Sequence, residues 1–468
     1  MKTDESQFNC KMDNKLFYTF LCSILPQHPK HSGVKSIEGA KLISALAHKH
    51  GIPVTWRLNS DCVQDVKDVI SQGHSSFGDD VIIMIDPTII FKETGIMPSS
   101  KAEETVILRQ SLPELIISEQ NKVKSALPWT EARVIGSDFK ASALIQILDE
   151  LDCSGLWGYH WEEEDNYGFG DRGCPWSFFL ASRDHYNIPA HHGRIVAVES
   201  SSLDLNAVYY TGNSHIFSAN PKSLWLSRLC TDKDDSYGKA LLNEYVRNCQ
   251  WNRFLFFTQE LNAYDMEYAS YEAYDKGTIA GLAHLMDSFF REVESNEQIQ
   301  PLSLSDAINL YKIEFQRTES CCMIFDSIVP PKEINFFAPP EPKKKPPYPL
   351  TLFYYDSECQ MSFREGQMTP VEVKNYAQPP FESKNYIEKE IPSISKFYPF
   401  RDRDRLIMEF EIESSKRMPY GLTIWDDHSM FSLVSTSART VKWIGTHLLF
   451  MRFDLDEGMN QVEITLSI

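Results

Sequence analysis

The sequence predicts an α/β fold, a parallel (β/α)7-type barrel followed by an antiparallel β-sandwich domain. Three observations support this fold class. Up to about residue 300, strands that are apolar on both faces alternate with segments of helical periodicity, as in a parallel sheet covered by helices. Eight prolines then gather within residues 329–349. Beyond them, only short alternating strands separated by turn residues remain, which is typical of a sandwich.

Each barrel strand is expected where an apolar run is bounded by polar or turn residues. The first is the run LFYTFLCSI, and the run VIIMI, which ends at Asp86-Pro87, is the least ambiguous. The expected strands cover residues 16–24, 53–58, 81–85, 132–135, 155–160, 194–199 and 254–258. Helical periodicity predicts helices over residues 36–50, 62–72, 102–126, 141–151 and 269–293.

Six or seven such units favour a closed barrel. An open doubly wound sheet is the alternative, although no glycine-rich phosphate-binding turn follows the first strand. We expect the barrel over residues 1–328, a proline-rich linker over 329–349, and the β-sandwich over 350–468. The sandwich strands are expected at residues 350–356, 405–413, 420–426, 430–436, 448–455 and 461–468.

The charge and the cysteines limit the partners and the compartment. Lys and Arg number 46 against 65 Asp and Glu, a formal net charge of −19, which disfavours nucleic acid and anionic membrane surfaces as partners. No apolar run is long enough to span a bilayer, and the first residues are polar and acidic, unlike a signal peptide. The ten cysteines are scattered without a CxxC motif, as expected for reduced thiols in the cytoplasm. The oligomeric state is not predicted.

In a parallel barrel the functional residues follow the carboxyl ends of the strands. Asp138, after the fourth strand, and Glu260, after the seventh, are the best-placed pair of carboxylates for acid–base hydrolysis. Asp138 opens a helix, so an N-cap role is the alternative for it. Arg133 would orient Asp138, and Glu199, which ends the sixth strand, is a candidate substrate-binding residue.

The segment WGYHWEEEDNYGFGDRGCPW, residues 157–176, combines aromatic, acidic and glycine residues. Flat rings stack on the apolar face of a sugar, and carboxylates accept its hydroxyl protons. We therefore expect a sugar platform with hydroxyl-binding neighbours. Its members are Trp157, Trp161 and Trp176 for the platform, and His160, Glu162 and Asp171 for the polar contacts. The alternatives are a surface Ω-loop packed on its own aromatics and, for residues 162–165, a solvated acidic turn or a cation site.

The order of these pieces resembles the polysaccharide deacetylase family, the NodB-homology barrel. The likeness is clearest across ARVIGSDFKASALIQILDELDCSGLWGYHWEE, where Arg133 and Gly136 match a family turn and Trp157 the strand tryptophan. The segment containing Gly73-His74 is similar to the one that precedes the family's metal-binding histidines, and FYTF to the start of its first strand. The resemblance implies a barrel and a carbohydrate ligand, with His74 near the site.

This chain departs from the family at the metal-binding positions. Leu21 and Cys22 stand where the family's aspartates are expected, and residues 77–80, Phe-Gly-Asp-Asp, replace its paired histidines. The resemblance therefore argues against the usual zinc-dependent deacetylation. Similar barrels with an appended β-domain occur among retaining α-glycosidases, in which a carboxylate after strand four is the nucleophile and one after strand seven the acid. Asp138 and Glu260 are in similar places.

Three hypotheses follow. The first is a metal-independent, carbohydrate-active hydrolase without a cofactor, in which Glu260 is the general acid and Asp138 the nucleophile or base. Their carboxyl groups should lie about 5–5.5 Å apart in a retaining enzyme and roughly 6.5–9.5 Å apart in an inverting one. The second is a non-catalytic glycan-binding protein on a degenerate barrel. The third is a metal-dependent deacetylase with a rebuilt site, using His74, Asp79, Asp80 or His160.

Overall fold

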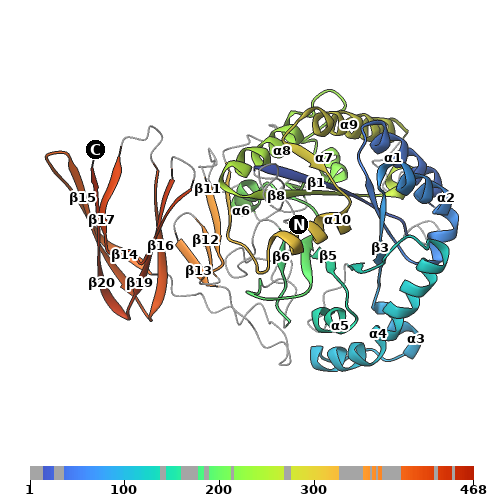
Figure 1. The fold of residues 1–468 in the computed structure, drawn as a ribbon, viewed down its shortest axis with the longest axis horizontal. Helices are drawn as coiled ribbons and strands as arrows, with labels where there is room; N and C mark the ends of the chain where they lie inside the picture. The colour runs from blue at the N-terminus through green and yellow to red at the C-terminus, as the bar shows by residue number, and fades with distance from the viewer. Residues whose placement is uncertain are drawn as a thin grey trace, which may run out of the picture.

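The computed structural model describes residues 14–25, 36–137, 144–159, 178–183, 189–211, 216–267, 276–325, 351–358, 361–364, 367–370, 392–425, 431–444 and 448–467. Within these residues, the first two-thirds of the chain form a nine-stranded sheet surrounded by helices (Figure 1). Its strands are β1 (Lys15–Ser23), β2 (Val54–Leu58), β3 (Asp80–Met84), β4 (Val134–Gly136), β5 (Gly155–Tyr159), β6 (Phe179–Leu180), β7 (Val196–Glu199), β8 (Phe254–Asn262) and β9 (Ile299–Pro301).

The strand order is β6-β7-β5-β4-β3-β2-β1-β8, and every described pair is parallel except β6 with β7. β1 is central, because β8 pairs with it along its whole length, from Lys15↔Phe254 to Ser23↔Asn262. Its other edge is shared: β9 pairs with its first half and β2 with its second half. The predicted parallel barrel is therefore confirmed.

The segment that follows β7 forms hydrogen bonds with β8. The Ser202 backbone N–H donates to Thr258 O at 2.8 Å, and the Thr258 N–H donates to Ser202 Oγ at 2.9 Å. Ala219 N–H in turn donates to Ser202 O at 2.6 Å. These bonds satisfy backbone groups on β8 that no further strand of the sheet pairs with among the described residues. These hydrogen bonds thus place the segment after β7 beside β8.

Helices surround the sheet, and all of those described except α10 pack on its outer face. They are α1 (Ile37–Lys49), α2 (Ser60–Phe77), α3 (Thr88–Thr94), α4 (Lys101–Ala126), α5 (Leu144–Glu150), α6 (Leu205–Thr211), α7 (Pro221–Leu226), α8 (Ser236–Asn248), α9 (Lys276–Ser295) and α10 (Leu304–Glu314), with short 3-10 turns η1 (Cys249–Trp251) and η2 (Ala263–Met266). The sequence analysis missed α3, α6, α7, α8 and α10 and located the other described helices.

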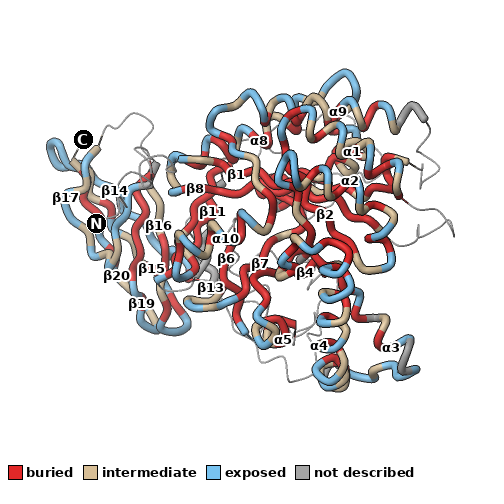
Figure 2. Tube along the Cα trace, turned by 45° about the vertical axis from the view of Figure 1, so that its right-hand side comes forward, coloured by how far each residue is buried: buried red, intermediate tan, exposed pale blue. Residues whose placement is uncertain are grey.

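Strand residues alternate between two hydrophobic clusters, as the period of two requires. On β1, Tyr18 and Phe20 pack outward with the helices, whereas Phe17 and Leu21 pack inward. α10 belongs to the inner cluster: its Leu304 N–H donates to Thr55 Oγ1 of β2 at 2.8 Å. Figure 2 shows the resulting band of buried strands. The core thus has an outer and an inner layer, and the inner face continues to the carboxyl ends of the strands.

The rest of the chain forms three antiparallel sheets in the described residues. β10 (Cys321–Phe325), β11 (Thr351–Asp356), β12 (Met361–Arg364) and β13 (Gln367–Pro370) form one, beside the barrel (Figure 1). The sandwich consists of β14 (Ser393–Asp402), β15 (Arg405–Ser414), β20 (Gly458–Ser467) and β17 (Ser432–Thr436) against β16 (Met418–Trp425), β19 (Leu448–Leu455) and β18 (Thr440–Ile444). The predicted β-sandwich is confirmed.

Sheet β10–β13 lies between the barrel and the β-sandwich along the chain. β10 precedes the predicted linker and pairs with β11, which follows it. The domain bounds at 328 and 350 stay a prediction. A small cluster of Cys322, Ile324, Tyr354 and Phe450 packs across the joint, and Arg452 of β19 forms a buried ion pair with Asp356 of β11.

The sandwich is not evenly covered. β15, β19 and β20 supply most of its core, whereas every residue of the edge strand β14 is exposed, including Phe397 and Tyr398. In the described part of the chain, no helix is both long enough and apolar enough to cross a membrane.

Candidate active site

The inner face of β8 carries Glu260 to the carboxyl end of the barrel. Phe254 and Phe256 belong to the inner cluster, and Thr258 Oγ1 accepts a hydrogen bond from Thr19 Oγ1 of β1 at 3.0 Å. Glu260 is next on this face because alternate residues of a strand point the same way. It is paired with Leu21 of β1 in the ladder and is partly buried. Glu260 therefore lies on the inner face towards the carboxyl end of β8, the end at which parallel barrels carry their functional residues.

Asn220 fixes the direction of the Glu260 carboxylate. Its Nδ2 donates to Glu260 Oε1 at 3.1 Å. Its Oδ1 caps α7, accepting from the N–H groups of Lys222 at 2.9 Å and Ser223 at 3.4 Å. The amide cannot be reversed without breaking the cap, so the donor must face Glu260. The sequence signal was available: Asn220-Pro221 is an N-cap followed by proline in the first turn of a helix.

A buried ion pair lies beside this contact. Lys222 Nζ is 2.8 Å from Asp265 Oδ1, and Asp265, in η2, is fully buried. Burial raises the pKa of the Asp265 carboxyl, and the Lys222 ammonium opposes that rise. Asn220 and Lys222 thus connect the first turn of α7 to two acidic groups of the β8–η2 segment.

Arg57 and Trp157 form a second inner-face pair. Arg57 of β2 is 5% exposed, and its Cζ lies 4.9 Å from the centroid of the Trp157 ring. Gly136 of β4 makes room for it, because a Cβ there would lie 2.8 Å from Arg57 Cδ. Trp157 is 1% exposed and packs in the inner cluster. Its ring is a support for Arg57, and the open sugar platform predicted for it is not visible at this residue.

Glu199 of β7 lies on the outer face of the sheet, opposite to the face that carries Glu260. Val196 and Val198 of β7 are in the inner cluster, so Glu199, the next residue, alternates toward the helices. There its charge, together with burial as the larger cause, raises the pKa of the Tyr245 hydroxyl of α8. Glu199 and Glu260 therefore occupy different faces of the sheet.

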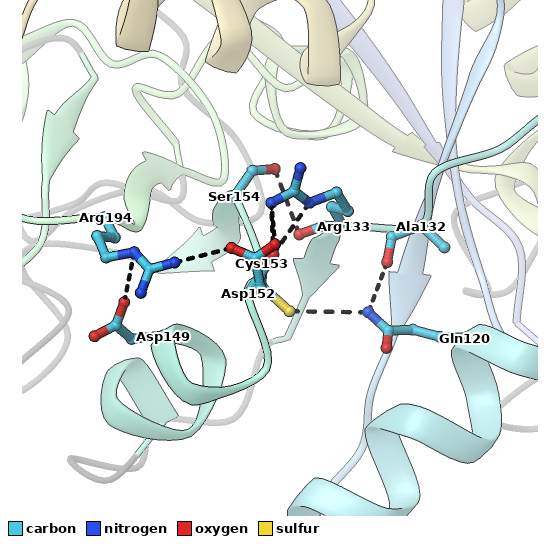
Figure 3. A network of polar contacts seen from close by, with 8 residues as sticks. All are labelled: Gln120, Ala132, Arg133, Asp149, Asp152, Cys153, Ser154 and Arg194. Carbon is cyan, nitrogen blue, oxygen red and sulfur yellow. Dashed lines mark hydrogen bonds and ion pairs between the residues drawn. The ribbon is translucent and has the colours of Figure 1, made fainter.

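Arg133 lies at the opposite edge of the sheet from Glu260. It precedes β4, and its Nη2 donates to Asp152 Oδ2 at 2.7 Å, while Asp152 also binds Arg194 at 2.9 Å (Figure 3). Asp152 precedes β5, so this network is at the amino-terminal ends of the strands. The structure does not bring Arg133 to the barrel mouth.

His74 is also at the amino-terminal edge. It ends α2, where its Nδ1 is 2.8 Å from Asp79 O and its ring stacks on Trp129 at 3.8 Å. Asp79 is fully engaged with the structure around it, accepting from Val54 N–H at 2.9 Å and Trp56 Nε1 at 2.7 Å. Asp79 precedes β3, which is not next to β8 in the strand order, so neither side chain is a neighbour of Glu260.

Six predicted residues lie outside the described residues: Asp138, His160, Trp161, Glu162, Asp171 and Trp176. Their roles stay predictions. Within the residues that are described, no group of three or more His, Cys, Asp or Glu side chains could hold a metal ion.

Leu21 and Cys22 of β1 lie on opposite faces of the sheet. Leu21 points inward and is apolar, whereas Cys22 packs outward with the helices. Burial, and secondarily the charges of Glu260 and Asp265, raise the pKa of the Cys22 thiol, so it is not a thiolate at neutral pH. Neither residue supplies a carboxylate or a nucleophile. At this end of the barrel the described inner face carries the Glu260 carboxylate and the Arg57 guanidinium.

No protein-family model matches this chain, and no curated protein matches it. The solved structures that resemble it include a putative polysaccharide deacetylase from Mycobacterium smegmatis, 10% identical, with a TM-score of 0.39 over 66% of this chain and 94% of that chain. A 4-α-glucanotransferase from Thermococcus litoralis is 8% identical, with a TM-score of 0.36 over 97% of this chain and 100% of that chain. A novel α-amylase from Thermotoga maritima is 9% identical, with a TM-score of 0.36 over 63% and 74%. With TM-scores below 0.5, none of these likenesses bears on what this chain binds or does.

Proposed function

We propose that this chain is a carbohydrate-active hydrolase that acts on a glycan or glycoside, with Glu260 as its general acid. The observation that carries the proposal is the position of Glu260, inward at the carboxyl end of β8 with its Oε1 held by Asn220 at 3.1 Å. A general acid must point at the leaving-group oxygen in a fixed direction, and the capped amide supplies that direction.

Asp138 is the proposed partner carboxylate. It follows β4 by two residues, and β4 is four positions from β8 in the strand order. Strands lie about 4.8 Å apart, so in a curved sheet these two ends face the mouth from different sides. That placement suits two carboxylates on either side of a glycosidic bond.

Arg57 is proposed to perform the task that the sequence analysis gave to Arg133. Its side chain packs on Gly136, the last residue of β4, with Asp138 two residues further along the chain. A guanidinium in a poorly solvated site favours the ionised form of a nearby carboxylate. Asp138 would then act as the nucleophile or base, and Glu260 as the general acid.

The test is turnover of a panel of chromogenic glycosides and acetylated sugars by the wild type and by Glu260→Gln, with and without chelator. We expect glycoside cleavage that the substitution lowers by at least about a hundredfold and that chelator does not affect. Glu114→Gln, an exposed residue of α4, is the matched control and should retain activity. Equal activity of Glu260→Gln and wild type would overturn the proposal, and chelator-sensitive acetate release would favour a deacetylase.

A second function is favoured by Leu21. An apolar side chain on the inner face at the end of β1, beside Glu260 in the ladder, is compatible with a barrel that binds a glycan without cleaving it. This alternative predicts no turnover anywhere in the panel, together with a rise in melting temperature on adding the sugar that binds.

A further inference from the structure

A serine, a histidine and an aspartate form a hydrogen-bonded chain on the outer face of the barrel, where α1 packs beside α2 (Figure 1). Ser44 Oγ lies 3.1 Å from His48 Nδ1, one helical turn further along α1, and His48 Nε2 lies 2.8 Å from Asp79 Oδ1. Asp79 comes directly before β3, at the amino-terminal edge of the sheet, whereas Glu260 lies towards the carboxyl end of β8. The three side chains are therefore separate from the candidate active site.

The hydrogen bonds of Asp79 determine which nitrogen of His48 carries the proton. Asp79 is 1% exposed, and its two oxygens accept from the Val54 N–H at 2.9 Å and from Trp56 Nε1 at 2.7 Å. Because both oxygens act as acceptors, Nε2 of His48 is the donor in its bond with Asp79. In the neutral ring, Nδ1 then holds the lone pair and faces the Ser44 hydroxyl.

The surroundings hold the His48 ring in one plane. The Phe77 ring stacks on it, with centroids 4.1 Å apart and an angle of 5° between the planes. Gly73 of α2 leaves the space for this arrangement, because a Cβ there would collide with Asp79 Oδ2 and lie 2.9 Å from His48 Cε1. The His48 side chain is only 11% exposed. Its Nδ1 is therefore directed at Ser44 by the packing of two helices and a buried carboxylate.

The Ser44 hydroxyl has no other hydrogen-bonding partner in the part of the chain that the structure describes. A serine within a helix often bonds the carbonyl oxygen four residues back, as Ser75 of α2 does with Ser71 O at 2.9 Å. Ser44 is instead partly exposed and directs its hydroxyl to His48. Serine is a weak nucleophile unless a neighbouring base removes its proton, and His48 is such a base.

We propose that Ser44 is the nucleophile of a separate catalytic site that hydrolyses esters, with His48 as its base and Asp79 as the positioning residue of His48. Ser44 Oγ bonds to the ester carbonyl carbon while His48 Nδ1 takes the serine proton. The bond from that carbon to the alcohol oxygen then breaks, and His48 gives the proton to the departing alcohol. Water attacks the acyl-serine in the same way, its proton passes through His48 to Ser44, and the acid is released.

The test is labelling of the full-length protein with a fluorophosphonate, in which Ser44 Oγ displaces fluoride from phosphorus, together with hydrolysis of p-nitrophenyl acetate. Both are measured in a Glu260→Gln background, so neither result depends on the proposed glycoside hydrolysis. We expect mass spectrometry to find the label on the Ser44 peptide and none in Ser44→Ala. Labelling in His48→Gln should be slower by at least about a hundredfold, and ester hydrolysis should fall in both variants.

Ser75→Ala is the matched control, because Ser75 is an exposed helical serine whose described hydrogen bond goes to Ser71 O. It should react as the parent does. Melting temperatures show whether each variant is folded, and Ser44→Ala removes a single described hydrogen bond. Absence of label at Ser44, unchanged ester hydrolysis in Ser44→Ala, or equal labelling rates in His48→Gln and the parent would each overturn the proposal.

Discussion

At the scale of single residues, Asn220 is the contact through which the candidate site can be tuned. Asn220→Asp retains an oxygen for the α7 cap but places a second carboxylate against Glu260. Two carboxylates in contact repel each other, which favours protonation of one of them. We therefore expect the part of the pH–activity profile that reports the general acid Glu260 to move to higher pH by about one unit or more. The measurement is kcat/KM against pH on the substrate that the panel identifies.

Asn220→Ser separates tuning from folding. Serine still caps the helix but offers no donor at the reach of the amide, so stability should change by less than about 1 kcal/mol while activity falls. If both variants show the wild-type pH profile, Asn220 does not position Glu260.

Asp204 predicts a pH dependence of stability. It is 1% exposed, accepts from Tyr237 Oη at 2.6 Å and from Ala207 N–H at 2.9 Å, and burial, the largest cause, raises its pKa to about 6. Between an unfolded pKa of about 3.9 and the folded value, the folded state binds more protons than the unfolded state. The contribution of Asp204 is therefore fully present below about pH 4 and is lost as the pH rises to about 6.

The measurement is urea unfolding of the wild type and Asp204→Asn at pH 4 and pH 7. Between pH 4 and pH 7, we expect the unfolding free energy of the wild type to fall by about 2–3 kcal/mol relative to that of Asp204→Asn. Asp402→Asn, an exposed residue of β14, is the control and should show no such shift. A pH-independent difference for Asp204→Asn would show that its carboxyl does not titrate in this window.

A site residue could be predicted from the sequence where a local pattern marks it, and not where contacts between distant segments determine its role. Glu260 was found because it directly follows a long apolar strand, a local pattern. Arg57 ends a strand in the same way, but its partners Gly136 and Trp157 come from two other strands, and the sequence does not record that contact. Arg133 was misplaced for a related reason: only the structure shows that it precedes β4 and binds Asp152.

At the scale of elements, the packing of α1 on η2 depends on Gly39. A Cβ at this position would lie 1.8 Å from Ala263 O, and the Gly39 N–H donates to Glu267 Oε2 at 3.3 Å. We expect Gly39→Ala to destabilise the protein by about 2–4 kcal/mol, because backbone must move to admit the methyl group. Thermal or urea unfolding measures it.

Gly238→Ala is the matched control, since Gly238 is also helical and its added Cβ would meet only an ordinary contact, Cys230 Sγ at 3.4 Å. Alanine's higher helix propensity should leave it neutral or slightly more stable, by up to about 1 kcal/mol. Equal destabilisation by both substitutions would mean that the contact with Ala263 is not the cause.

Elements were predictable where a single run determined them. The expected strands at 16–24, 53–58 and 81–85 correspond to β1, β2 and β3 within a residue. β14 was missed because Pro399 and its charged flanks obscure the alternation, and its backbone is ordered by pairing with β15. β9 is three residues long and gains its identity only from pairing with β1, nearly three hundred residues earlier. Pairing of this range leaves no local pattern.

At the scale of the whole molecule, the Arg452–Asp356 pair connects the sandwich to the barrel side. Both side chains are almost fully buried, 7% and 4% exposed. Arg452→Met leaves Asp356 charged in a buried site, so we expect a loss of about 3–5 kcal/mol and separation of calorimetric unfolding into two transitions.

Arg439→Met gives the comparison, because Arg439 forms an exposed ion pair with Asp454 on the same sheet, with side chains 69% and 39% exposed. It should lower stability by no more than about 1 kcal/mol. A single transition in Arg452→Met, with a midpoint equal to that of Arg439→Met, would contradict a structural role for the buried pair.

The central place of β1 has a consequence for synthesis. β1 begins at Lys15, yet the strands along its flanks include β8 and β9, which end at Asn262 and Pro301. At about 5–20 residues per second, the ribosome needs on the order of 15 to 60 seconds to deliver them. For that time a strand that is apolar on both faces lacks its partners and is a natural substrate for chaperones. The pairing of β1 with β8 and β9 can therefore be completed only after about 300 residues have been made.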